Sequence, residues 1–267
     1  MNKTMDFAQE ISAQIEGSEV QEVEKANGVK LTGIVFPTGA ANVKAIIYAD
    51  DLMKEGLTVE EAAEKIRKVQ ELEATNKINI DFINDFEAVK PRLRARLFNE
   101  RTSAAVKKSA AEYGFSDLVI IPYITGIETG NGAGAIKVTA GLMETWGVSP
   151  DEVIRIAEDN SKDDFRITSM ASYLAGMGQP MPGIIDDPMS IVTNESMSFG
   201  AYAIIPALDD LKKRFKNGFI VLPSSVHEVL VVDVTDSPEL DLMVEEVNDT
   251  TVNPTEQLSN HAYRIAA

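Results

Sequence analysis

Apolar side chains occur in short blocks whose spacing changes along the chain between that of helices and that of strands. The first block has a four-residue spacing and predicts an amphipathic helix that ends near Gly17. Two strand-like stretches follow at 19–26 and 30–36, and Asn27-Gly28 between them favours a tight turn because both residues tolerate positive φ. A third strand is expected at 43–48. These four elements predict a helix followed by a three-stranded meander.

The middle of the chain carries clear helix starts and one continuous apolar run. Thr58 and Glu61 form a capping box at the start of a helix. Residues 92–98 alternate between polar and apolar side chains, as a half-buried strand does. Residues 118–125 are apolar throughout and predict a strand that is covered on both faces. Residues 149–152 combine a cap, a first-turn proline and an acid, and they begin a further helix.

The C-terminal third repeats the same two kinds of element. Apolar blocks at 189–193 and 199–204 predict a hairpin, and those at 219–222 and 229–234 predict a second strand pair. A helix follows the second pair. Its predicted buried stripe consists of Leu240, Met243, Val244 and Val247.

Hairpins recur with helices between them, and βαβ alternation is absent. The chain is therefore predicted to have an α+β fold, in which antiparallel hairpins carry helices mainly on one face, in mixed αββ(β)α and ββαββα units. We expect an N-terminal α+β region at 1–160, an irregular connection at 161–188 and a C-terminal ββαββα region at 189–267. The regions are expected to pack together as one compact unit.

Composition narrows the classes of function. The chain has no cysteine, which excludes disulfides and a cysteine nucleophile and suits a reducing cytoplasm. No apolar run is long enough for a signal peptide or a membrane span, so we expect a cytoplasmic protein that does not contact a membrane. The net charge of −17 repels nucleic acid, so direct nucleic-acid binding is not expected and the partner is expected to be another protein. No cofactor motif and no metal-binding motif is present, and we predict neither a cofactor nor a metal site.

The chain has two histidines, and the first lies in a polar turn between two apolar strands. A serine, His227 and a carboxylate in this turn would supply the nucleophile, base and orienting group of a hydrolase. No Gly-x-Ser-x-Gly motif is present, however, and a serine this close in sequence to its histidine seldom has the required geometry. A hairpin in which the serine hydroxyls bond the turn backbone is the favoured interpretation. The candidate residues are Ser224, Ser225, His227 and Glu228.

The second histidine lies in another polar cluster close to the end of the printed sequence. If both clusters meet in space, they form either a ligand cleft or a structural latch that holds this part of the chain, and we expect the latch. The candidate binding residues of this cluster are Asn260, His261, Tyr263 and Arg264.

Three arginines, Arg92, Arg94 and Arg96, alternate with apolar residues in the predicted strand at 92–98. Their side chains are expected to share one face of it. Three aligned guanidinium groups are suited to an anionic ligand, but they are equally suited to the chain's own surplus carboxylates. Pairing with those carboxylates is the favoured interpretation.

Several motifs follow one another along almost the whole chain. They include Thr32-Gly33-Ile34-Val35-Phe36-Pro37, Trp146-Gly147-Val148, Phe199-Gly200-Ala201, Pro223-Ser224-Ser225-Val226-His227-Glu228, Glu245-Glu246-Val247-Asn248 and Leu258-Ser259-Asn260-His261-Ala262-Tyr263-Arg264. In these motifs the chain resembles an uncharacterised family of clostridial and other gut Firmicutes proteins that is catalogued as domain of unknown function five-six-eight-eight. The resemblance implies no established activity and no catalytic residue, and it implies an association with mobile and conjugative elements, on which proteins of this kind are common.

Three functional hypotheses follow. The favoured one is a non-enzymatic binding or accessory protein that acts on another protein through its acidic surface. The second is a hydrolase-like enzyme centred on His227. The third is an acidic DNA mimic that blocks a nucleic-acid enzyme, which the charge and the implied mobile-element association suggest together. A salt-dependent affinity would favour the mimic, and hydrolysis lost on changing His227 would favour the enzyme.

Overall fold

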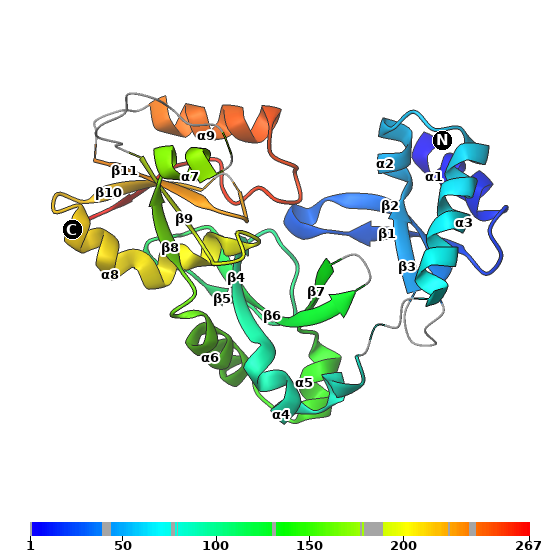
Figure 1. The fold of residues 1–267 in the computed structure, drawn as a ribbon, viewed down its shortest axis with the longest axis horizontal. Coiled ribbons are helices and arrows are strands. Elements are labelled where there is room, and N and C mark those ends of the chain that lie inside the picture. The colour runs from blue at the N-terminus through cyan, green and yellow to red at the C-terminus, as the bar shows by residue number, and fades with distance from the viewer. Residues whose placement is uncertain are drawn as a thin grey trace. The chain divides into compact units, whose positions relative to one another are not determined.

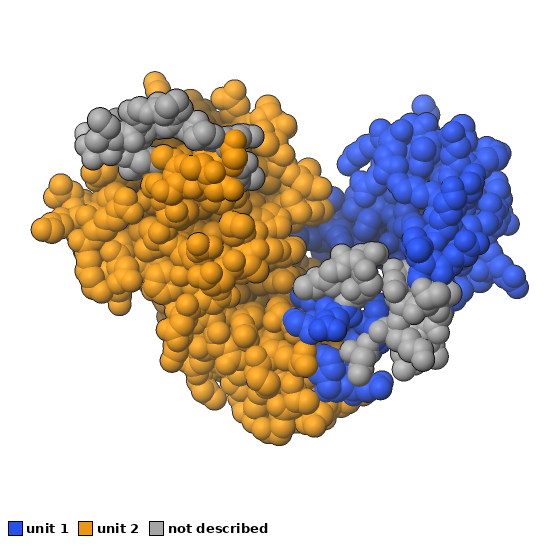
Figure 2. All heavy atoms as spheres, in the orientation of Figure 1, with its two compact units in different colours: residues 1–82, 126–135 blue, residues 83–125, 136–267 orange. Residues whose placement is uncertain are grey.

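The computed structural model describes residues 2–38, 44–75, 78, 80–129, 132–176, 178, 189–223, 225–234 and 239–267. Its strands form three antiparallel sheets with helices between them, so the predicted α+β class is confirmed (Figure 1). The chain divides into two compact units, which Figure 2 colours separately. The first unit holds residues 1–82 and 126–135, and the second holds 83–125 and 136–267. The expected connection at 161–188 stays a prediction, because most of 177–188 lies outside the described residues.

The first unit has a three-stranded sheet in the order β1-β2-β3, which confirms the predicted meander. Asn27 and Gly28 both have positive φ, 62° and 70°, as the turn between the first two strands requires. The capping box is also formed, since the Thr58 amide donates to the Glu61 carboxylate at 2.9 Å. The elements of this unit are α1 (Lys3–Ser12), β1 (Glu19–Glu24), η1 (Ala26–Gly28), β2 (Lys30–Pro37), β3 (Lys44–Tyr48), α2 (Ala49–Lys54), α3 (Val59–Thr75) and η2 (Asp81–Asn84, which reaches the next unit).

The core of the first unit lies between the helices and one face of this sheet. Apolar residues of α1, α2 and α3 pack with two residues of β2 there, and their burial is what holds the helices on the sheet. The fully or almost fully buried members are Ala8, Ile11, Ile15, Ile34, Phe36, Ala49, Leu52, Ala62, Ala63 and Ile66.

The second unit contains the other two sheets. One has five strands in the order β12-β10-β11-β9-β8, and the other is built on β4, β5 and β6 with β7 paired to β6. The outer part of the β6–β7 hairpin, residues 126–135, groups with the first unit. The elements are α4 (Phe86–Val89), η3 (Lys90–Arg92), β4 (Leu93–Asn99), β5 (Lys108–Ser109), η4 (Ala111–Tyr113), β6 (Leu118–Thr129), β7 (Gly132–Lys137), α5 (Ala140–Trp146), α6 (Pro150–Ser161), β8 (Arg166–Ser169), α7 (Met170–Gly176), β9 (Met189–Thr193), η5 (Gly200–Ala203), α8 (Ile204–Arg214), β10 (Phe219–Leu222), β11 (Val229–Asp233), α9 (Glu239–Thr250) and β12 (Tyr263–Ile265).

The predicted hairpin at 189–204 is wrong, and the strand pair predicted after it is confirmed. Residues 200–203 form the 3₁₀ turn η5 and Ile204 begins α8, so the block at 199–204 is not a strand. A short apolar run without a period does not distinguish a buried strand from a buried helix start, which explains the error. The predicted pair β10–β11 is antiparallel, with Phe219 opposite Asp233.

The helix α9 buries a narrower stripe than its sequence predicts. Leu240 and Val244 pack against Ile220 and Leu222 of the five-stranded sheet. Met243 is 49% exposed and Val247 is 36% exposed, so their predicted burial is wrong. The inward positions next to Leu240 and Val244 are instead taken by polar side chains that bond the segment after the helix, as described below.

Two further features complete the fold around the site. Residues 253–256 form a turn, and residues 263–265 add a strand to β10. Within the described ranges, no helix is both long and apolar enough to cross a membrane.

Candidate functional site

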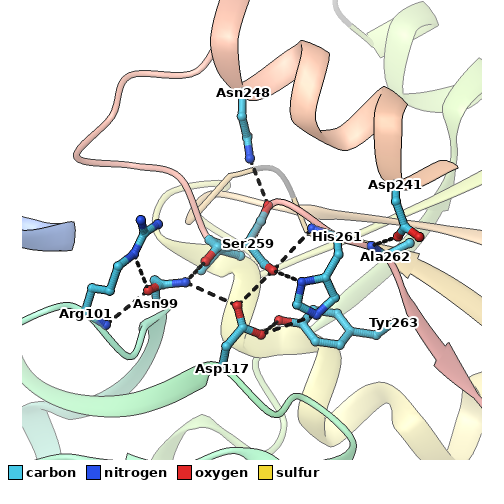
Figure 3. A network of polar contacts seen from close by, with 10 residues as sticks. Asn99, Arg101, Asp117, Asp241, Asn248, Ser259, His261, Ala262 and Tyr263 are labelled. Carbon is cyan, nitrogen blue, oxygen red and sulfur yellow. Dashed lines mark hydrogen bonds and ion pairs between the residues drawn. The ribbon is translucent and has the colours of Figure 1, made fainter. Parts of the chain in front are cut away.

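The densest group of polar contacts in the second unit surrounds Asp117, in the turn that precedes β6 (Figure 3). One carboxylate oxygen accepts from the Ser259 hydroxyl at 3.0 Å, and the other accepts from the Tyr263 hydroxyl. The His261 ring nitrogen Nε2 lies 3.6 Å from the same carboxylate. Ser259, His261 and Tyr263 all belong to residues 256–265, which we call the latch segment. A single side chain from the β5–β6 turn therefore contacts three side chains of the latch segment.

Burial fixes the protonation state of Tyr263. The side chain is 5% exposed, and its ring packs edge-on against Phe115. Burial and the neighbouring Asp117 carboxylate raise the pKa of the Tyr263 hydroxyl well above its usual range, because the phenolate would be both desolvated and repelled. The hydroxyl therefore keeps its proton to a higher pH than an exposed tyrosine does, and it donates that proton to Asp117.

Three further side chains bond the backbone of the latch segment (Figure 3). Asn99, at the end of β4, donates to the Leu258 carbonyl at 2.7 Å. Asn248 of α9 donates to the Ser259 carbonyl at 2.8 Å, and Asp241 of the same helix accepts from the Ala262 amide at 2.6 Å. The latch segment is thus held from β4, from the turn before β6 and from α9. Its backbone also pairs with β10.

Serine, histidine and aspartate meet in this network, but their arrangement is not that of a nucleophilic triad. Ser259 is 1% exposed, so a substrate carbonyl has no access to its hydroxyl. That hydroxyl donates its only hydrogen to Asp117, and it therefore accepts from His261 Nδ1, 3.0 Å away. A base that donates to the serine is unable to take its proton. The network holds the latch segment to the rest of the unit, whereas the latch expected between the two histidine clusters stays a prediction.

The surroundings of His227 also differ from those of a catalytic base. Its Nδ1 accepts from the Phe199 amide at 3.1 Å, so the proton of the neutral ring lies on Nε2, which faces Glu256 at 3.6 Å. Its carbonyl accepts from Gly200 and from the Thr193 hydroxyl. Both the ring and the backbone of His227 thus hold the turn 193–200.

The predicted partners of His227 have local roles where they are described. Ser225 is 7% exposed, and its hydroxyl accepts from the His227 amide at 3.0 Å, which is the turn bonding favoured from the sequence. Burial raises the pKa of the Glu228 carboxyl. Ser224 lies outside the described residues. Among the described serines, none has a hydroxyl bonded to the His227 ring.

The two histidine clusters are joined through the backbone rather than through a shared cleft. The Val226 amide donates to Glu256 and the Ser259 amide donates to Pro223, while Ser225 forms an isolated bridge with Gln257. His227 faces Phe199 and Glu256, whereas His261 faces Asp117. Asn260 accepts from Asn248, and Arg264 lies 3.9 Å from Asp241 on the surface. Each of the four residues of the second cluster therefore has at least one contact with the rest of the unit.

The three arginines have three different environments. Arg92 ends the turn η3 and precedes the strand. Arg94 donates to the carbonyls of Pro91 and Leu93, at 2.9 and 2.8 Å. The Arg96 guanidinium contacts two aromatic rings, with its carbon 4.5 Å from the Tyr123 centroid and 4.1 Å from that of Phe199. In the part of the chain that the structure describes, neither Arg94 nor Arg96 forms an ion pair, so the favoured pairing with surplus carboxylates does not hold for these two.

The outer face of α9 combines exposed apolar and acidic side chains. Leu242 is 65% exposed and the adjacent Met243 is 49% exposed, while Val247, one turn after Met243, is 36% exposed and lies at the border with the buried side of the helix. The acids Glu245, Glu246 and Asp249 are exposed along it, and none of them is ion-paired to another described residue. We call Leu242, Met243, Glu245, Glu246, Val247 and Asp249 the α9 face.

Two other features give weaker indications of a functional site. A groove of about 390 Å³ runs along α3 in the first unit, but its lysines, Lys65 and Lys68, are already paired with Glu55 and Glu64. The described residues contain no group of three His, Cys, Asp or Glu side chains placed to hold a metal ion.

A family model described as a family of unknown function (DUF5688) matches residues 4–265. Because the match spans nearly the whole chain, the protein belongs to this family, as the motifs suggested. No curated protein and no solved structure matches the chain.

Sequence reasoning missed the residues that organise both clusters. Asp117 binds partners 142 and 146 positions away, and no local pattern marks such a residue. Phe199 and Asn248 carried a usable signal, since both lie in motifs on which the family resemblance rests. Gly200 belongs to the same motif, and a Cβ there would lie 2.6 Å from the Asn194 amide nitrogen, so only glycine fits without a shift.

Proposed function

We propose that this protein is a non-enzymatic accessory protein that binds another protein through the α9 face. The observation that carries the proposal is the exposure of Leu242, Met243 and Val247 on a helix whose inner side is fully occupied. Single exposed apolar residues are common, but three within one short stretch of one helix gather exposed apolar area, as docking surfaces do. Helices commonly bind partners through anchors at helical spacing, and Met243 and Val247 have such a spacing.

Charge identifies the chemistry of the partner. Glu245, Glu246 and Asp249 flank the apolar side chains, and the whole chain has a net charge of −17. A partner segment that is amphipathic and basic, with apolar anchors between lysines or arginines, matches both features. Charge complementarity of this kind raises the association rate and selects against acidic partners.

The geometry of the histidines gives the hydrolase hypothesis no comparable support. The Ser259 hydroxyl is buried and donates to Asp117, and His227 Nδ1 is occupied by a backbone amide. A cytoplasmic location is part of the proposal, because a chain without cysteine suits a reducing compartment.

The proposal is tested by comparing proteins captured from an extract of the native host by three forms of the chain. Leu242→Ser removes an anchor that is 65% exposed, and Leu72→Ser on α3 is a matched control at 66% exposure. We expect a basic protein to bind the wild type and the Leu72→Ser variant but not the Leu242→Ser variant. That protein, once purified, should bind about tenfold more weakly when salt is raised from 50 to 300 mM, because screening shortens the range of the charges.

Identical capture by all three forms would contradict the proposal. An affinity that does not change with salt would contradict the assignment of a basic partner. A captured protein that the Leu72→Ser variant loses instead would place the interface on α3.

A further inference from the structure

The guanidinium of Arg96 lies close to two aromatic rings, those of Tyr123 and Phe199. It is half-buried in β4, where Leu93, Ala95 and Leu97 fill the opposite face of the strand. Tyr123 pairs across the sheet with Arg94, two residues from Arg96, and this register places its ring beside the Arg96 guanidinium. Phe199 covers the guanidinium at 4.1 Å. The stacking of a guanidinium on aromatic rings leaves the N–H groups at its edge free to bond in the plane.

These N–H groups have no acceptor within the described chain. No hydrogen bond or ion pair joins the Arg96 side chain to another described residue, although burial lowers its pKa by penalising the charge. The Arg96 nitrogens are not among the buried unbonded polar atoms of the described chain, so these donors face solvent, where a ligand can reach them. An anionic ligand in the plane of the guanidinium would accept from these donors in place of water.

The ring over Arg96 is held by an unusual backbone. Phe199 has φ 49° and ψ 36°, in the left-handed region that favours glycine. His227 holds it there, because its Nδ1 accepts from the Phe199 amide and its ring lies 5.0 Å from the Phe199 ring. The ring of Phe98, which is 4% exposed, packs against the rings of both Tyr123 and Phe199. Strained backbone of this kind costs on the order of 1 kcal/mol or more and is concentrated at functional sites. Ser225 bonds the amide of His227, and His227 in turn holds the Phe199 ring in place.

We propose that Arg96, Tyr123 and Phe199 form a binding site for the carboxylate of a ligand that carries an apolar or aromatic group. A carboxylate is planar and accepts two parallel hydrogen bonds from one guanidinium. It also carries a single charge, which suits one arginine in a chain of net charge −17, whereas a phosphate dianion calls for more positive charge. The aromatic rings beside the guanidinium provide contact area for the apolar group. The ligand is either a free small acid or the C-terminal carboxylate of a peptide.

This site is independent of the α9 face. Its residues come from β4, β6 and the turn before η5, and none of them belongs to α9. Failure of one proposal therefore leaves the other unchanged.

The test is a titration of the full chain followed by the Nε–Hε resonances of its arginines in a ¹H–¹⁵N spectrum. Sodium benzoate represents a free acid, and N-acetylphenylalanine represents a peptide C-terminus. Two compounds serve as comparisons: N-acetylphenylalanine amide lacks the carboxylate, and phenyl phosphate carries a phosphate group in its place. We expect a saturable shift of the Arg96 resonance with one or both carboxylates and none with the amide. The carboxylate that binds more tightly shows whether the ligand is a free acid or the C-terminus of a peptide.

Two variants assign the shift to the guanidinium. Arg96→Lys keeps the charge but loses the planar pair of donors, and it should weaken binding about tenfold or more, as read from the Phe199 ring protons. Arg94→Lys is the matched control, because Arg94 lies on the same strand face but donates to backbone carbonyls, and its binding should equal that of the wild type. Absence of a saturable shift with both carboxylates in the wild type overturns the proposal, whether or not the variants fold. Tighter binding of phenyl phosphate than of either carboxylate also overturns it.

Discussion

Replacing Asp117 by alanine removes the acceptor that joins the β5–β6 turn to the latch segment. Two buried hydroxyls lose their partner: that of Ser259, which is 1% exposed, and that of Tyr263, which is 5% exposed. A buried polar group without a partner costs about 1–3 kcal/mol. In the variant the Ser259 hydroxyl is able to donate to His261 Nδ1 once the ring carries its proton on Nε2 instead, and water reaches the position of the Asp117 side chain, which is 26% exposed. We therefore expect Asp117→Ala to lower the free energy of unfolding of the second unit by about 2–3 kcal/mol.

The single tryptophan, Trp146, makes the measurement specific to that unit. It lies in α5, and its indole donates to the Ile83 carbonyl within the same unit. Urea unfolding followed by Trp146 fluorescence therefore reports the second unit even if the two units unfold separately. With an m-value of about 2 kcal/mol/M, the expected loss shifts the midpoint down by roughly 1–1.5 M urea.

Controls separate the network from a general effect of charge removal. Asp210→Ala on α8 removes an exposed acid that pairs with Lys213, and it should change the stability by less than about 0.5 kcal/mol. Tyr263→Phe removes the donor together with its need for an acceptor, so Asp117→Ala should cost less in that background than in the wild type. A midpoint for Asp117→Ala that matches the Asp210→Ala control would refute the assignment of the latch.

Three further predictions concern stability. Gly200→Ala should lower the unfolding midpoint by the equivalent of about 1–3 kcal/mol, because its Cβ would lie 2.6 Å from the Asn194 amide nitrogen; an unchanged midpoint would mean that the turn moves freely. The stability of Met243→Asp in thermal unfolding should stay within about 0.5 kcal/mol of that of the wild type, since the residue is 49% exposed. A large loss of stability would mean that Met243 is buried. Burial raises the pKa of Glu228 above its ordinary value of 4.5, so the folded state binds this proton more tightly than the unfolded state does. Stability from this group is therefore present at low pH and falls as the pH rises from 4.5 through the raised pKa, and Glu228→Gln should reduce that slope; equal slopes in a pH series of urea midpoints would count against the burial of its charge.

Local signals in the sequence predicted the local structure well. Asn27-Gly28 and the Thr58 and Glu61 capping box are each complete within four residues, and both are formed. The pair β10–β11 follows from two apolar runs separated by a polar turn. Such elements depend on neighbours in sequence, which a reader of the sequence can see.

The errors occur where tertiary contacts decide between alternatives. The apolar run 199–204 forms a turn and a helix start because Gly200 packs against Asn194 and its amide bonds His227. Met243 fits a helical stripe, yet α9 turns Asp241 and Asn248 inward to bond the latch segment, and this rotation exposes it. The role of Asp117 depends on contacts across more than 140 residues, which no pattern in a single sequence contains.

The most direct test of the proposed function places a photoreactive amino acid at position 242 in the native host. The same substitution at position 72 is the comparison, because the two leucines have almost equal exposure, 65% and 66%. We predict that irradiation joins the chain to one basic protein from position 242 and not from position 72, and that raised salt before irradiation lowers the yield. Equal products from both positions, or none from position 242, would contradict the assignment of the α9 face as the docking surface.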